Sequence, residues 1–121
     1  MPVKSSKETK LKKQILEIIF KYISRETCTI FLFGSFAQKE IYPSSDIDVG
    51  LISDKALKNS ILIRIKEGLG DVNTLRDIDI TDFSSIQDKN FLRIALKETK
   101  IWHQTKKSRA CLDNLKKRIA G

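Results

Sequence analysis

The stretch from residue 28 to residue 51 reads CTIFLFGSFAQKEIYPSSDIDVGL, and the fold depends on it. It opens on β-branched and aromatic residues, which predict a buried strand over residues 27–33. Gly34 and Ser35 break that run. Residues 36–45 fit a short helical turn and a polar loop that carries a proline, so the chain leaves one strand and returns to form another.

The end of the stretch, residues 46–51, alternates polar and apolar residues and predicts a second strand. Side chains alternate between the two faces of a strand, so Asp46 and Asp48 share one face while Ile47 and Val49 point into the core. Two carboxylates this close repel each other unless a cation lies between them, and Mg²⁺ prefers oxygen ligands. The pattern therefore predicts a centre with two magnesium ions, which is typical of nucleotidyl and phosphoryl transfer.

A third predicted strand offers a further acid. Residues 77–81 read DIDIT, so Asp77 and Asp79 share a face, and either one can reach the same metals if this strand lies beside the first Asp-x-Asp strand. Upstream, the backbone N–H groups at Gly34 and the hydroxyl of Ser35 suit a phosphate. Each feature alone is common in proteins, but their combination in this order favours a phosphoryl or nucleotidyl transferase.

The remaining elements follow from apolar periodicity and turn residues. The order is that of an α/β (α+β) fold, a sheet covered by helices on at least one face. The additional predicted elements are an amphipathic helix over 7–25, a helix over 55–69 closed by Gly68 and Gly70, the strand over 77–81, a helix over 89–97 capped by Ser84 and Ser85, and a basic helical tail over 105–121.

Length and composition restrict the class of protein. The 121 residues suffice for one domain with a real core, and 40% of them are hydrophobic. No apolar run approaches the roughly 20 residues of a membrane span, and the polar, basic N-terminus does not resemble a secretory signal, so we expect a cytoplasmic protein. Cys28 and Cys111 stand far apart, which argues against a disulfide framework or a zinc ribbon; Cys28 is expected in the core and Cys111 half buried.

The formal net charge of +8 is unevenly placed. Residues 1–14 carry five lysines and one acid, and residues 97–121 carry eight basic and two acidic residues. Residues 15–96 have ten basic and twelve acidic residues, a net charge of −2. Basic ends around an acidic centre suit an acidic partner or ATP better than a nucleic acid, which would favour a uniformly basic surface.

The segment FLFGSFAQKEIYPSSDIDVGL, with IDITDF further on, resembles the minimal nucleotidyltransferase (MNT) domains of the DNA polymerase β-like superfamily. The resemblance spans about residues 10–103 and implies that family's fold, a small mixed sheet with helices packed on it. It also implies two Mg²⁺ ions and a set of site residues. By position these are Asp46, Asp48 and Asp79 as catalytic and metal-binding residues, and Gly34, Ser35, Ser45 and Lys39 as nucleotide-binding residues.

The resemblance further implies a partner and a reaction. Small proteins of this family pair with a helical HEPN-type toxin, and the best understood members transfer AMP from ATP to a tyrosine of that toxin, so that the MNT protein acts as its antitoxin. We expect an MNT domain over residues 1–104 and a basic tail over residues 105–121, the chain forming a hetero-oligomer with its partner.

Ala37, Gln38 and Lys39 depart from the Ala-Arg-Gly that usually follows the Gly-Ser pair in the family, and Lys39 can supply the missing positive charge. An alternative is therefore an antitoxin that neutralises its partner by contact alone; a weaker one is a nucleic-acid binder. The tail is interpreted first as a solvated basic helix and second as a docking helix. His103 and Trp102 are interpreted as structural residues.

Overall fold

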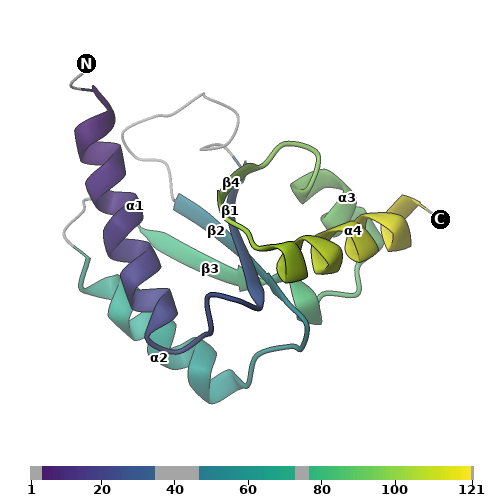
Figure 1. Cartoon of the computed structure of the whole chain (residues 1–121), viewed down its shortest axis with the longest axis horizontal. Coiled ribbons are helices and arrows are strands. Elements are labelled where there is room, and N and C mark those ends of the chain that lie inside the picture. Colours follow the sequence, from purple (N-terminus) through teal and green to yellow (C-terminus); the bar gives the residue numbers. More distant parts are fainter. Residues whose placement is uncertain (1–3, 35–46, 73–76, 121) are drawn as a thin grey trace.

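A computed structural model describes residues 4–34, 47–72 and 77–120 of the chain, and the side chains from Lys10 onward. Helices alternate with strands along the described chain except at the first two strands, and the helical turn predicted between these, within residues 36–45, lies outside the described residues (Figure 1). The elements are α1 (Lys4–Phe20), β1 (Cys28–Phe33), β2 (Ile47–Ser53), α2 (Asn59–Gly70), β3 (Ile78–Asp82), the 3₁₀ turn η2 (Phe83–Ser85), α3 (Lys89–Ala95), β4 (Lys100–His103) and α4 (Lys106–Ala120).

The four strands form one mixed sheet in the order β3-β2-β1-β4. Strand β1 runs antiparallel to both of its neighbours, β2 and β4, while β2 and β3 are parallel and are connected through α2. This architecture confirms the expected α/β fold with a small mixed sheet.

Helices α1 and α2 cover one face of the sheet, and α3 and α4 cover the other (Figure 1). Strand residues that point toward α1 and α2 pack on the first face, and strand residues that point toward α3 and α4 pack on the second face. The first core cluster includes Ile15, Ile19, Ile30, Leu32, Ile47, Val49, Leu51, Ile65 and Ile80. The second includes Phe31, Phe33, Ile52, Phe83, Leu92, Leu112, Leu115 and Ile119. Strands β1 and β2 therefore contribute to both clusters by the period of two, whereas β3 and β4 contribute to the first cluster.

Helix α4 is part of this second core. Its residues Leu112, Leu115 and Ile119 are buried, at the spacing that the sequence predicts for its apolar stripe. The helix starts at a reciprocal cap, in which Thr105 N donates to Ser108 Oγ at 2.8 Å and Ser108 N donates to Thr105 Oγ1 at 3.1 Å. At the other end, the Ile119 carbonyl accepts a hydrogen bond from the Arg93 guanidinium of α3. The tail is therefore packed on the sheet by its apolar face and solvated on its basic face.

Several element boundaries differ from the sequence predictions. Helix α1 ends at Phe20 rather than near residue 25, and strand β4 was not predicted. Asp88, not the serine pair, caps α3: its carboxylate accepts from the backbone N–H groups of Asn90 and Phe91. Within the described residues, no helix combines the length and the apolar character that crossing a membrane requires.

Gly68 does not close α2 as predicted but lies inside it. A Cβ at this position would come within 2.9 Å of the Ile18 side chain on α1. The glycine therefore allows α1 and α2 to cross closely over the first core cluster.

Candidate active site

Two of the predicted catalytic acids lie side by side on the sheet. In the parallel pairing of β2 with β3, Asp48 is the register partner of Asp79. Ile47 and Val49, the chain neighbours of Asp48, are fully buried in the first core cluster, so Asp48 points to the opposite face, as the alternation predicts. Asp48 is half-buried and Asp79 is exposed, which leaves this pair of carboxylates accessible from solvent.

Gly34 lies against this pair. It follows β1 directly and adopts φ = +73°, a left-handed conformation that side chains disfavour. A Cβ built on Gly34 would lie 2.5 Å from Asp48 Oδ2. The backbone after β1 therefore approaches the Asp48 carboxylate at a distance that only glycine permits.

Four of the predicted site residues lie outside the described residues. These are Ser35, Lys39, Ser45 and Asp46. Within the described part of the chain, no three acidic, histidine or cysteine side chains group together as a metal site. Asp48 and Asp79 nevertheless fit the predicted ion, because they bring hard carboxylate oxygens together on one accessible face.

The register also shows which of Asp77 and Asp79 lies beside Asp48, a choice that the alternation of the sequence left open. Asp77 comes before β3, and its carbonyl accepts a hydrogen bond from Ile47 N at 2.8 Å. Asp79, two residues later, is the one opposite Asp48. Asp79 is therefore the acid of this strand that adjoins Asp48.

Asp82, the third acid of this segment, has a structural role that the sequence analysis did not recognise. It is 5% exposed, and its carboxylate accepts from Leu57 N at 2.8 Å and from Ser84 N at 3.0 Å. These bonds fix the segment that leads into α2 and the turn after β3. The signal was available, because Asp82 is three positions from Asp79 and so faces the other side of the strand.

A cluster of phenylalanines adjoins the carboxylates, and the sequence analysis missed it. Phe33 is the antiparallel partner of Asp48, so Asp79, Asp48 and Phe33 form a row across three strands. The Phe33 ring packs edge-on against Phe83 at 5.0 Å and against Phe91 of α3 at 6.5 Å between centroids. We refer to Phe31, Phe33, Phe83 and Phe91 as the aromatic cluster.

His103 lies on the far edge strand and has structural contacts. Its Nε2 is 2.7 Å from the Arg25 carbonyl oxygen, and its ring packs edge-on against Phe20 at 4.8 Å. Trp102 packs against the first core cluster. Both residues therefore behave as the sequence analysis interpreted them.

The sequence of the chain matches the family described as "Polymerase beta, Nucleotidyltransferase" over residues 7–108. The chain belongs to this family. The match covers every strand of the sheet and the whole row from Asp79 to Phe33. A search of curated proteins found no match.

Among solved structures, the nucleotidyltransferase fold of this chain recurs in toxin–antitoxin complexes. One is a toxin–antitoxin complex with AMP-PNP, at 19% identity and a TM-score of 0.72, covering 90% of this chain and 86% of that one. Another is the tri-AMPylated Shewanella oneidensis HEPN toxin with its MNT antitoxin, at 16% identity and a TM-score of 0.65, covering 93% and 82%. A third is an MntA-HpeT variant with two aspartates changed to glutamate, at 17% identity and a TM-score of 0.71, covering 90% and 86%. At these identities the likeness shows the fold.

Proposed function

We propose that this protein is a nucleotidyltransferase that transfers AMP from ATP to a hydroxyl group, namely a tyrosine of a cognate HEPN-type toxin, and that it thereby acts as the antitoxin. The observation that carries the proposal is the in-register pair of Asp48 and Asp79 beside Gly34, in a chain of the nucleotidyltransferase family. The AMP-PNP and the AMPylated toxin in the complexes of similar fold support the choice of nucleotide and acceptor.

The site residues would have two roles, metal binding and nucleotide binding. Asp46 and Asp48 would hold two Mg²⁺ ions, with Asp79 as a further ligand of one of them. When bound, these ions neutralise the phosphate charge and activate the attacking oxygen. Gly34 and Ser35 would bind the triphosphate through backbone N–H groups and a hydroxyl, with Ser45 and Lys39 adding contacts to the nucleotide.

The chemistry is an in-line displacement at the α-phosphorus. The acceptor oxygen forms a bond to this phosphorus, the bond to the bridging oxygen of the pyrophosphate breaks, and pyrophosphate leaves. Asp79 is exposed to solvent, so an acceptor side chain can reach it, and its carboxylate would take the hydroxyl proton.

The test is label transfer from ATP to the helical protein encoded beside this one, with magnesium present. We expect Asp48→Asn and Asp79→Asn each to lower the rate at least about a thousandfold, because each removes several kcal/mol of stabilisation of the transition state. Asp77→Asn, two residues before Asp79 and outside the paired part of β3, and Asp113→Asn on the exposed face of α4 are matched controls that should retain the activity. Transfer that survives Asp48→Asn would refute the proposal.

The second candidate is an antitoxin that neutralises its partner by contact alone, and the observation that favours it is the altered segment Ala37, Gln38 and Lys39. The two candidates separate in a growth assay with the toxin expressed. Loss of protection in the Asp46→Asn/Asp48→Asn double variant supports catalysis, provided that the variant still binds its partner. Retained protection supports contact.

A further inference from the structure

We propose that Phe91 is the stacking surface for the nucleobase of the nucleoside triphosphate substrate. This inference rests on the proposed function and adds a binding residue to it. Its basis is the continuity of the aromatic cluster with the carboxylate row: Asp48 is the register partner of Phe33, whose ring contacts Phe91.

Phe91 is the member of the aromatic cluster that reaches solvent. Phe31 and Phe83 are fully buried and Phe33 is 9% exposed, whereas Phe91 is 38% exposed. Exposing an aromatic ring costs hydrophobic free energy, since packing it fully would be more stable. The ring is nevertheless held firmly, because Phe33 and Phe83 contact it and the Asp88 carboxylate accepts from the Phe91 backbone N–H.

The position of Phe91 matches what a nucleotide requires. In a nucleoside triphosphate the base lies one ribose away from the α-phosphate, so phosphates at the carboxylates put the base a short distance along the same surface. From Asp48, the path across the second sheet face leads through Phe33 to Phe91. A base in that position meets a flat apolar ring, and every base has a π face that can stack on it.

The other exposed aromatic side chain among the described residues does not share this position. Tyr22 follows α1, the helix on the opposite face of the sheet from Asp48. Phe91 is therefore the exposed aromatic residue, within the described part of the chain, that lies on the carboxylate face.

The experiment compares binding of AMP-PNP with binding of inorganic tripolyphosphate, both with magnesium. We expect Phe91→Ala to weaken AMP-PNP about tenfold, within the range for loss of one base–aromatic stack, and to leave tripolyphosphate unchanged. Phe91→Trp should bind AMP-PNP as well as the wild type does or better. Phe91→Leu keeps an apolar side chain that packs on the cluster, so it should fold normally yet show most of the loss.

Ile94 provides the matched control, because it lies one turn further along α3 and is 76% exposed. Ile94→Ala should leave both affinities within about twofold of the wild type. If Phe91→Ala and Ile94→Ala spare AMP-PNP binding but both weaken partner binding, this face of α3 is a protein-docking surface and the inference fails. If Phe91→Ala instead raises only the KM for the acceptor, the ring receives the tyrosine, and the inference also fails.

These outcomes differ from a failure of the proposed function. Wild-type protein that binds neither AMP-PNP nor tripolyphosphate would overturn both proposals together. Protein that binds nucleotide and labels its partner, but is indifferent to Phe91→Ala and Phe91→Leu, would overturn the base-stacking role alone.

Discussion

Two features of the structure require glycine at position 34: a positive backbone φ and the close approach of the Asp48 carboxylate. The φ of +73° at Gly34 favours glycine, and the missing side chain leaves room for the Asp48 carboxylate. We expect Gly34→Ala to lower the free energy of unfolding by about 1–3 kcal/mol, through strain and through displacement of the carboxylate. Urea denaturation measures the first effect, and magnesium-dependent AMP-PNP binding, which should weaken, measures the second.

Gly70→Ala is the matched control for that substitution. Gly70 is the last residue of α2, and a Cβ there would meet nothing within 4 Å. The change should be neutral or slightly stabilising, because alanine loses less backbone entropy on folding than glycine does. Equal stability of the Gly34→Ala and Gly70→Ala variants would contradict the close approach of Gly34 to Asp48.

The side of the strand to which each acid points could be predicted, but not its partner on the next strand. The period of two predicts that Asp48 faces away from Ile47 and Val49, as the structure shows. Whether Asp77 or Asp79 lies beside Asp48 depends on the register of a parallel pair, which is fixed by backbone pairing far apart in the sequence. The resemblance to MNT domains favoured Asp79, and the register puts Asp79 beside Asp48.

At the scale of elements, long periodic segments were predictable and short edge elements were not. Residues 100–103 form a strand of four residues, which is too short to show a period of two in the sequence, so β4 could not be predicted. The aromatic cluster could not be predicted either, because it forms between elements far apart in the sequence. Phe33 and Phe91 are 58 positions apart and come together only when α3 packs on β1.

The packing of α4 leads to a prediction at this scale. Leu112 is 6% exposed and packs in the second core cluster with the aromatic cluster. We expect Leu112→Ala to cost about 2–4 kcal/mol, because it removes buried apolar contacts and leaves a cavity. Lys116→Ala, on the exposed face of the same helix, should change the stability by less than about 0.5 kcal/mol. Chemical denaturation of both variants checks this, and similar values would contradict the docking of α4 on the sheet.

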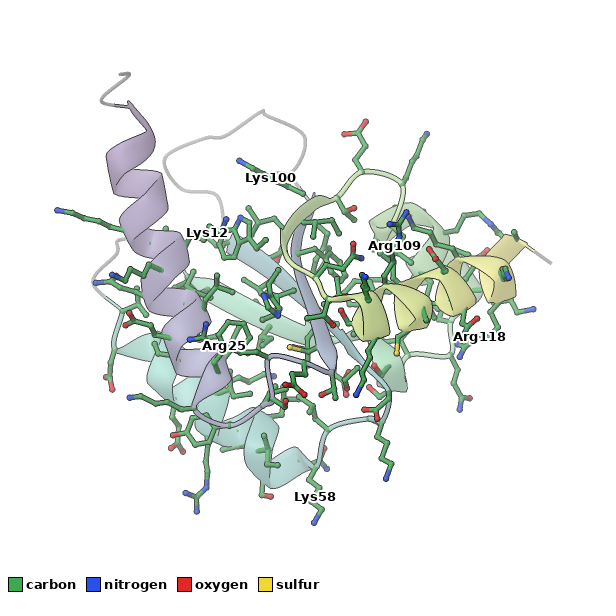
Figure 2. The ribbon with its side chains drawn as sticks, viewed as in Figure 1. Lys12, Arg25, Lys58, Lys100, Arg109 and Arg118 are labelled. Atoms are coloured by element: carbon green, nitrogen blue, oxygen red, sulfur yellow. The ribbon has the colours of Figure 1, made fainter. Side chains whose placement is uncertain are left out.

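At the scale of the whole molecule, the sheet separates the two basic ends of the sequence. Figure 2 shows Lys12 on α1 and Arg109 and Arg118 on α4, and these helices cover opposite faces of the sheet. Among the described side chains, the positive charges of these two helices therefore lie on opposite sides of the sheet. Part of the charge also serves the fold, since the Arg118 guanidinium donates to the Ile86 carbonyl.

The Cys28 thiol makes the stability of the whole molecule depend on pH, because it is fully buried in the first core cluster. Burial raises the pKa of its thiol from 9.0 to about 11. Between about pH 9 and pH 11 the unfolded chain loses this proton while the folded protein keeps it. The stabilisation is therefore complete below pH 9 and is lost as the pH rises, by an amount on the order of 2 kcal/mol.

Urea denaturation at pH 8 and pH 11 measures this decline in the free energy of unfolding. Cys28→Val removes the titrating group and should make the decline smaller; an identical decline in Cys28→Val and the wild type would exclude this linkage.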